Sequence, residues 1–209
     1  MNTVSYVLRD VAVLAVAYVV GSVPFSYIFA KVLTGVDITK VGSKNMGATN
    51  VLRAAGPVPA MFAFAGDFLK SVLLLVALEM LSPNMPRHTV LIAAVVVVLG
   101  HDFSVLAGFK GGKGVATTFG AVVVLSWPVA LLELGVWLGA MALRNTVSLA
   151  SVAAFAALPV MALLLRQPLQ LVLIYSLLAV LGIVRHGANI SRLRAGREPK
   201  LDRSYFRRR

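Results

Sequence analysis

Long apolar runs divide this chain, and they restrict its fold to one class. The runs extend from Val11 to Leu33, Val58 to Leu81, Thr89 to Phe109, Thr146 to Leu165 and Leu169 to Val184. A bilayer core of about 30 Å requires about 20 apolar residues in a helix. Only 13% of the residues are charged, against about 25% in a soluble domain. The sequence therefore predicts an all-α polytopic membrane protein.

The number of spans depends on the stretch from Val115 to Leu143, which is long for one span and short for two. Ser126-Trp127-Pro128 near its middle is typical of a turn, because proline disfavours helix in the residue before it. We therefore predict two short spans there and about seven in all. The N-terminus would lie outside and the C-terminus in the cytoplasm, with residues 1–209 forming one domain. Five or six spans with a re-entrant piece are the alternative.

The cationic residues favour seven spans. Segment 34–56, loop 110–114 and the tail from Arg185 then share the cytoplasmic side, while the outer side carries only Arg9, Arg87 and Arg166. Cytoplasmic loops of membrane proteins are enriched in Lys and Arg. This enrichment explains the net charge of +12 without a nucleic-acid partner. The terminal run Arg207-Arg208-Arg209 is expected to lie on anionic membrane lipid.

The chain has no cysteine, which excludes disulfides, thiolate nucleophiles and cysteine metal sites. Its histidines, His88, His101 and His186, are scattered and have few acids near them. We predict neither a metal nor a cofactor.

Residues 41–53 form a polar, glycine-rich insertion between two apolar runs. A linker needs only to be short and wettable, whereas this one concentrates groups that suit a phosphate. They are the backbone of Gly42 and Gly47, the side chains of Ser43, Asn45, Thr49 and Asn50, and the cations Lys44 and Arg53. Glycines allow φ > 0, so that N–H groups converge on an anion, and a guanidinium can hold a phosphate through two hydrogen bonds. Lys31 and Lys40 are interpreted as ordinary cytoplasmic cations.

The second polar segment, 101–117, contains Gly111, Gly112, Lys113 and Gly114 just before an expected helix. Free N–H groups at a helix N-terminus favour an anion. The segment is not a Walker A loop, because Ala107 stands where its first glycine is needed and Gly114 follows the lysine. His101, two turns earlier, is expected to be structural, with catalysis as the alternative.

The third segment, 185–200, is basic, as a membrane-bound tail would be. Binding to lipid does not explain His186, Asn189 or Glu198. An acid among so many bases can tie the tail to the other polar segments and hold a site together.

Charged residues are few in the predicted spans. Asp67 and Lys70 are three residues apart, so they share a helix face and can form an ion pair, which a membrane interior requires of charged residues. We interpret Glu133 as a residue that reaches toward the membrane surface near the proposed outer turn, and not as a site residue.

Together, GSKNMGATN…R, H-x7-FKGGKGVAT and RHGANISRLRAGREPK resemble the three motifs of the bacterial acyl-phosphate:glycerol-3-phosphate acyltransferases, the PlsY family. The resemblance covers nearly the whole chain. It implies transfer of a fatty acyl group from acyl phosphate to the 1-hydroxyl of glycerol 3-phosphate, the first step of bacterial phospholipid synthesis. It also implies a multi-pass protein of the bacterial cytoplasmic (inner) membrane, with its active site on the cytoplasmic side and functional coupling to the enzyme that makes acyl phosphate.

By this resemblance, Ser43, Arg53 and Lys113 are catalytic. The residues that would bind substrate are Gly42, Lys44, Asn45, Asn50, Gly111, Gly112, Gly114, His186 and Asn189. Glu198, Asp67, Lys70 and His101 would support the site. Two residues depart from the family's pattern: Lys44 stands where Gly is common and Met46 where Pro is common. A lysine at position 44 would be strained if the backbone there needs φ > 0.

The chemistry that the resemblance implies needs little beyond positioning and charge stabilisation, because acyl phosphate is already activated. Ser43 would orient the attacking hydroxyl or the oxyanion, while Arg53 and Lys113 would hold the phosphates. The base is a substrate phosphate oxygen, His186 or His101, and an acyl-enzyme on Ser43 is the alternative to direct transfer. The competing functions are a transporter for a phosphorylated metabolite or anion and a scaffold for anionic partners.

Overall fold

The computed structural model describes residues 3–82, 84–202 and 205, and the described chain is helical without strands. Its helices are α1 (Thr3–Ser22), α2 (Phe25–Thr34), α3 (Ala48–Ala55), α4 (Pro57–Leu81), α5 (Arg87–Asp102), α6 (Val115–Leu125), α7 (Trp127–Arg144), α8 (Val147–Leu164), α9 (Leu169–Arg185) and α10 (Gly187–Arg194), with a short 3-10 turn at Val105–Ala107. The all-α prediction is confirmed. Arg207, Arg208 and Arg209, expected on lipid, lie outside the described residues.

Five segments of the described chain are long and apolar enough to cross a membrane, and a sixth is added if α9 and α10, bent by 61°, form one span. The first of them combines α1 and α2 from Val4 to Thr34, so it begins earlier than the sequence predicted. The predicted turn at Ser126 is confirmed, since α6 ends at Leu125 and α7 begins at Trp127. Because α6 has only 11 residues, the total of seven spans and their orientation stay predictions.

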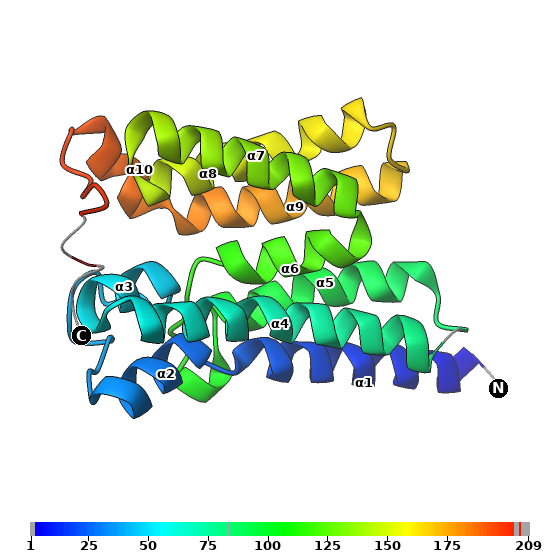
Figure 1. Ribbon diagram of the computed structural model, residues 1–209. Helices are drawn as coiled ribbons and strands as arrows, with labels where there is room; N and C mark the ends of the chain where they lie inside the picture. The colour runs from blue at the N-terminus through cyan, green and yellow to red at the C-terminus, as the bar shows by residue number, and fades with distance from the viewer. Residues whose placement is uncertain (1–2, 83, 203–204, 206–209) are drawn as a thin grey trace.

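The helices form two groups, which Figure 1 shows one above the other. In the first group α1 packs on α5, and α4 packs on α2, α3 and α6; in the second, α8 packs on α7 and α9. The groups meet where α6 contacts α7 and where α5 contacts α9. The central helix is α5, most of whose residues are buried.

The polar segments all reach the same end of the molecule. In Figure 1, α3, α10 and the start of α6 lie at the end opposite the N-terminus. Direct contacts join them there: the Met46 N–H donates to the Gly111 carbonyl (3.4 Å), and the Arg53 guanidinium donates to the Pro199 carbonyl (3.3 Å). We call this end the motif end.

Candidate active site

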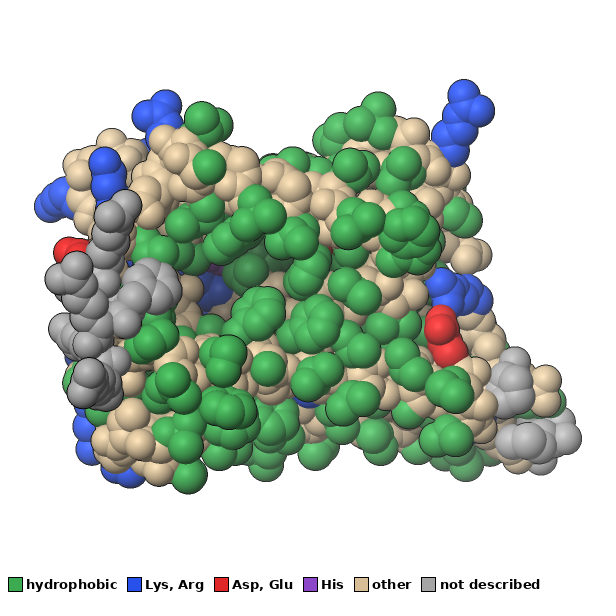
Figure 2. Space-filling model, in the orientation of Figure 1, with side chains coloured by type: hydrophobic (Ala, Val, Ile, Leu, Met, Phe, Trp, Pro, Cys, Tyr) green, Lys and Arg blue, Asp and Glu red, His purple; other side chains and the backbone are tan. Residues whose placement is uncertain are grey.

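A cavity of about 330 Å³ lies between the two helix groups. At the motif end its lining is polar and comprises Ser43, Asn45, Thr49, Asn50, Arg53, Lys113, Ser148, His186, Asn189 and Glu198. Farther along the helices it is largely apolar, with Phe64, Phe119, Leu134, Trp137 and Phe155. Figure 2 shows the cavity as a hollow among hydrophobic side chains, with cationic and histidine atoms visible inside it. A ligand with a polar head and an apolar tail fits this lining.

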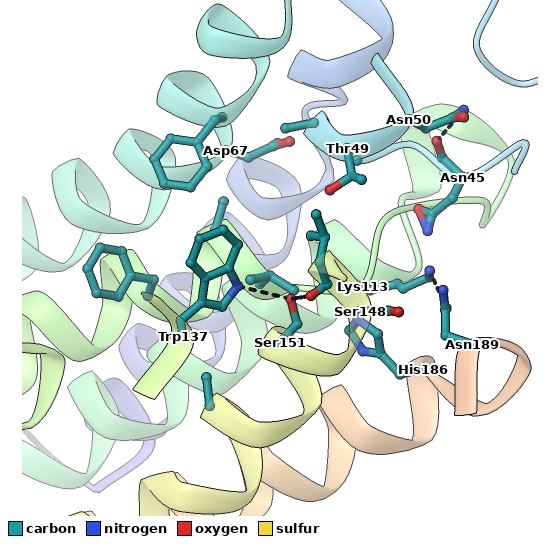
Figure 3. A pocket seen from close by; sticks show the side chains of 18 of the residues that line it. Asn45, Thr49, Asn50, Asp67, Lys113, Trp137, Ser148, Ser151, His186 and Asn189 are labelled. Carbon is teal, nitrogen blue, oxygen red and sulfur yellow. Dashed lines mark hydrogen bonds between the residues drawn. The ribbon is translucent and has the colours of Figure 1, made fainter. Parts of the chain in front are cut away.

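Asn50 holds the first polar segment in shape. The side chain is only 3% exposed; its amide donates to the carbonyls of Ile38 (3.0 Å) and Asn45 (3.1 Å), and its oxygen accepts the Ser43 N–H (3.0 Å). Gly42 lies against the same oxygen. Ser43 and Asn45, which these contacts hold, both line the cavity, and Figure 3 shows Asn45 beside Asn50.

Lys44 is exposed and has φ +56°, in the left-handed region. A lysine is strained there, as the sequence indicated for a position that needs positive φ. Neither Lys44 nor Gly42 is among the residues that line the cavity, so their predicted roles in substrate binding stay predictions.

The glycines of the second segment allow its loop to lie directly on the end of α5. A Cβ at Gly111 would meet the His101 and Asp102 backbone, and one at Gly112 would meet the His101 ring. The Gly112 N–H donates to the His101 carbonyl (3.1 Å), so it points into the protein and not toward a phosphate. Gly114, with φ +71°, begins α6. None of the three lines the cavity, whereas Lys113 between them does.

Lys113 is held by the third segment. Its ammonium group donates to the Asn189 side-chain oxygen (2.5 Å), and the Asn189 amide donates to the Glu198 carboxylate (2.6 Å). Figure 3 shows Lys113 and Asn189 pointing toward one another across the cavity mouth. Burial lowers the pKa of Lys113 to about 8, against the opposing effect of the Glu198 charge. The second and third motifs therefore meet through this chain of hydrogen bonds.

Glu198 connects the tail to helices α8 and α10. Its carboxylate accepts hydrogen bonds from Ser148 at the start of α8 (2.8 Å) and from Arg192 of α10 (2.7 Å), besides Asn189. Burial alone would raise the pKa of Glu198, but these three donors hold that pKa below its ordinary value. The carboxylate is thus ionised at neutral pH and fixes the tail against α8 and α10.

His186 lies at the bend between α9 and α10 and lines the cavity. Its Nδ1 is 2.7 Å from the Gly182 carbonyl oxygen; since that oxygen can only accept, Nδ1 carries the proton. Burial lowers the pKa of His186 to about 4 despite this hydrogen bond. The ring is therefore neutral at pH 7, and Nε2 has a lone pair available.

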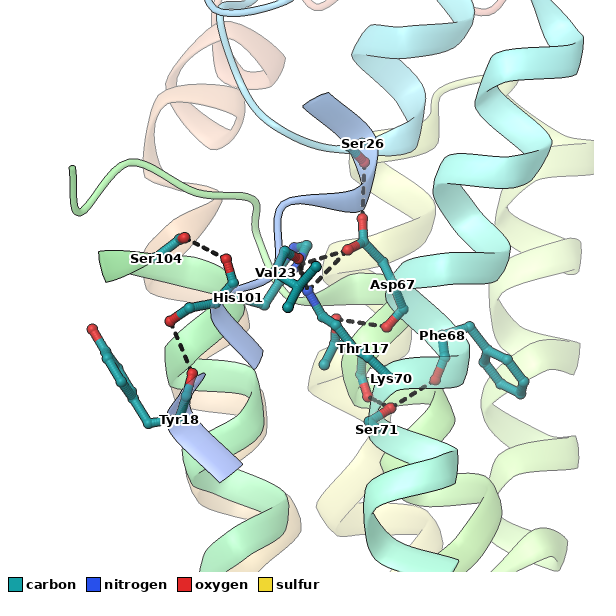
Figure 4. A network of polar contacts seen from close by, with 11 residues as sticks. Tyr18, Val23, Ser26, Asp67, Phe68, Lys70, Ser71, His101, Ser104 and Thr117 are labelled. Carbon is teal, nitrogen blue, oxygen red and sulfur yellow. Dashed lines mark hydrogen bonds and ion pairs between the residues drawn. The ribbon is translucent and has the colours of Figure 1, made fainter. Parts of the chain in front are cut away.

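The predicted ion pair between Asp67 and Lys70 is confirmed at 2.9 Å. Both side chains are buried (Figure 4), and Ser26 of α2 donates to the same carboxylate (2.8 Å). Lys70 also donates to the Val23 carbonyl (3.1 Å), in the break between α1 and α2. The pair therefore joins α4 to the bend of the first segment.

His101 belongs to this network. Its Nδ1 lies 2.9 Å from the Lys70 ammonium nitrogen and 3.3 Å from the Asp67 carboxylate. Nδ1 can accept from the ammonium, which has no lone pair, or donate to the carboxylate, while Nε2 lies beside Gly112. His101 also lines the cavity, so its expected structural role and catalysis as the alternative both stay predictions.

One sequence interpretation is wrong. Glu133 does not reach the membrane surface: it is 6% exposed and lines the cavity. The sequence placed it near a turn, but the face that a helix buries depends on its neighbours, and α7 packs this face inward against α8.

Sequence reasoning missed several residues at the site. Ser148 and Ser151 of α8 line the cavity, and Ser151 accepts a hydrogen bond from the Trp137 indole (3.2 Å; Figure 3). Serines in an apolar run give no signal by themselves. Arg185 donates to the carbonyls of Gly112 (2.7 Å) and Asp102 (3.0 Å), tying the loop to α5. Its position directly before His186 could have marked it.

Known proteins resemble this chain over almost its whole length. The family model described as glycerol-3-phosphate acyltransferase matches residues 11–196. A glycerol-3-phosphate acyltransferase of Syntrophomonas wolfei is 39% identical over 194 residues, which are 93% of this chain and 98% of that protein. One of Gluconobacter oxydans is 42% identical, covering 89% of this chain and 90% of that protein.

The fold also matches solved structures. The glycerol 3-phosphate form of PlsY (YgiH), an integral membrane glycerol 3-phosphate acyltransferase, matches with a TM-score of 0.86 and 36% identity, over 93% of this chain and 96% of that one. The lysophosphatidic acid form of the same protein matches with a TM-score of 0.85 and 35% identity, over 95% and 98%.

Proposed function

Because this chain belongs to the glycerol-3-phosphate acyltransferase family, we propose that its acyl donor is acyl phosphate and its product lysophosphatidic acid. The acyl group goes to the 1-hydroxyl of glycerol 3-phosphate, the first step of bacterial phospholipid synthesis. The observation that carries the proposal is one cavity with two linings, cationic at the motif end and apolar beyond it. Family membership makes the chain an enzyme and leaves the transporter and scaffold alternatives without support.

The motif end suits two phosphate groups. Arg53 from α3 and Lys113 from the glycine loop line the same cavity mouth, with Ser43 and Asn45 beside them. Charge-assisted hydrogen bonds are the strong contacts to phosphate. The apolar walls suit the acyl chain of a donor held by its head group. We further propose that this end faces the cytoplasm in the inner membrane, where a soluble phosphorylated acceptor is available.

The reaction that we propose is direct transfer. The 1-hydroxyl oxygen attacks the acyl carbonyl carbon, a new C–O bond forms, and the bond from that carbon to the phosphate oxygen breaks. Phosphate leaves with the bonding electrons. Ser43 is proposed to orient the hydroxyl or the developing oxyanion, while Arg53 and Lys113 stabilise the charge on the leaving phosphate.

The attacking hydroxyl must lose a proton. His186 offers a lone pair on Nε2, but a pKa of about 4 makes it a weak base, since a general base works best with a pKa near the operating pH. A phosphate oxygen of the substrate is the stronger acceptor, and it gains a proton as the donor's phosphate leaves. We therefore propose that the substrate supplies the base.

The test is turnover by the purified protein with glycerol 3-phosphate and one of three donors: palmitoyl phosphate, palmitoyl-CoA or palmitoyl-carrier protein. We expect lysophosphatidate and phosphate with palmitoyl phosphate alone. Ser43→Ala and Arg53→Ala should each lower kcat/KM by about 100-fold or more, as losses of transition-state donors do. Arg194→Ala, which removes an exposed arginine of α10 outside the cavity lining, is the matched control.

Turnover with palmitoyl-CoA or the carrier protein, and none with palmitoyl phosphate, would contradict the proposed donor. An acyl adduct on Ser43 in quenched reactions would contradict direct transfer.

A further inference from the structure

The apolar part of the cavity contains an acid that the proposed reaction does not use. Glu133 of α7 lines the cavity together with Phe119, Leu134 and Phe155. Its Oε2 atom is buried and has no hydrogen-bond partner within the described part of the chain. The Trp137 indole, one turn away, donates to Ser151 instead, and Lys70 is engaged by Asp67 and His101.

Glu133 marks the deep end of the cavity on its helix. Among the α7 residues in the lining it is the farthest from the motif end, eleven positions before Arg144, where α7 ends. That separation corresponds to about 16 Å of helix. If an acyl chain enters from the motif end and its phosphate stays at Lys113, only the carbons far from the phosphate come near Glu133.

Because Oε2 of Glu133 has no partner among the described residues, it depends on water in the cavity for a hydrogen bond. An acyl chain that stops short of Glu133 leaves this water in place. A longer chain displaces it and offers no hydrogen bond in return, and an unsatisfied buried polar group is destabilising. Each added methylene group therefore contributes less binding free energy at this depth than it would against an apolar wall.

We propose that Glu133 sets the upper length of the acyl chain that this site accepts. The inference rests on the proposed function, since it needs an acyl donor whose chain lies in the apolar part of the cavity. Glu133 acts in specificity, and the reacting groups at Ser43 and Lys113 are unchanged by it.

The experiment compares straight-chain acyl phosphates from 10 to 18 carbons, each at saturating glycerol 3-phosphate, and follows kcat/KM. For the wild type we expect kcat/KM to rise with length and then to fall. In Glu133→Leu, whose side chain is apolar and of similar volume, the fall should move to longer chains. The ratio of kcat/KM for the longest donor to that for the shortest should increase about tenfold. Glu133→Gln, which keeps a polar group at this place, should retain the wild-type profile.

Each ratio is taken within one variant, so a general loss of activity does not affect it. Glu79→Leu is the matched control: it makes the same change in an exposed acid of α4 that pairs with Arg87 and does not line the cavity. If Glu133→Leu does not fold, Glu133→Met provides the apolar side chain.

An unchanged length profile in the apolar variant, or a wild-type profile without a fall, would overturn the inference and leave the proposed function standing. Absence of turnover with every acyl phosphate would instead overturn the proposed function.

Discussion

The side chain of Lys113 is held in position by residues of the third polar segment, which is distant in sequence from the glycine loop that contains Lys113. The glycines on either side fit the loop to α5, while Asn189 accepts the ammonium hydrogen bond and Glu198 holds Asn189. The third motif therefore acts at the site through the second. Burial lowers the pKa of Lys113 to about 8, which brings the loss of its charge into the range of an activity measurement.

We expect kcat/KM to fall as the pH rises through about 8, because Lys113 is charged below its pKa and neutral above it. One pH unit above the pKa, only about a tenth of the enzyme retains the charge. Arginine stays charged throughout this range, so Lys113→Arg should remove the alkaline fall even if it lowers the rate at every pH. The check is the kcat/KM profile of the two proteins from pH 6 to 10, in which shared effects of substrate ionisation cancel. An identical alkaline fall in both would show that another group is responsible.

The polar residues of the motif end could be predicted from the sequence. Their individual roles could be predicted only in part. The sequence indicated four of these residues, because polar and charged side chains are not needed on a lipid-facing helix: Ser43, Arg53, Lys113 and Glu198. The task of Asn50 could not be predicted, since an asparagine serves a phosphate and a backbone turn with the same atoms. The inward position of Glu133 also escaped prediction, because the face that α7 buries is decided by its packing against neighbouring helices and not by its own sequence.

At the scale of elements, α1 and α5 approach each other at backbone distance. A Cβ at Gly100 would meet the carbonyl oxygen of Tyr18, and a Cβ at Gly21 would meet the backbone of Val97. Small residues allow helices in a membrane to approach at backbone distance, where van der Waals packing stabilises them. His101, next to Gly100, is placed against Lys70 by this crossing.

Gly100→Ala should lower the stability of the folded protein by about 1–3 kcal/mol, because the added methyl group forces the two backbones apart. Gly139→Ala on α7 is the control: nothing lies within 4 Å of the Cβ it adds, and alanine is favoured over glycine in a helix by about 1 kcal/mol. Thermal unfolding in detergent should show a lower Tm for the first variant and an equal or higher Tm for the second. Equal losses in both would mean that the crossing tolerates a methyl group.

The elements themselves were predictable from hydropathy, and so was the break at Ser126 from its proline. The break at Pro24 between α1 and α2 was not. The buried Asp67–Lys70 pair lies beside this break, because Lys70 donates to the Val23 carbonyl (3.1 Å), and Thr117 joins α6 to α4 by donating to the Asp67 carbonyl (3.0 Å).

At the scale of the whole molecule, the motif end and the opposite end carry loops that can be labelled separately. The wild-type chain has no cysteine, so single cysteines can be introduced without background. Asn84 lies between α4 and α5, away from the motif end, and Lys110 lies in the glycine loop; both are exposed.

With seven spans and the N-terminus outside, Asn84→Cys should react with a membrane-impermeant thiol reagent in intact bacterial spheroplasts. Lys110→Cys should react only after the membrane is opened. The cysteine-free parent provides the blank. Reaction of both variants in intact spheroplasts, or of Lys110→Cys alone, would contradict the predicted orientation.

The three polar segments are synthesised one after another, and the third is made last of them. Domains tend to form from the N-terminus during synthesis, and Ser43, Arg53 and Lys113 are made long before Asn189 and Glu198. Until the last helix pair is inserted, Lys113 lacks its partner and the Arg53 guanidinium lacks the Pro199 carbonyl. The nascent chain therefore acquires these contacts of Lys113 and Arg53 only after the third segment has been made and has folded against the other two.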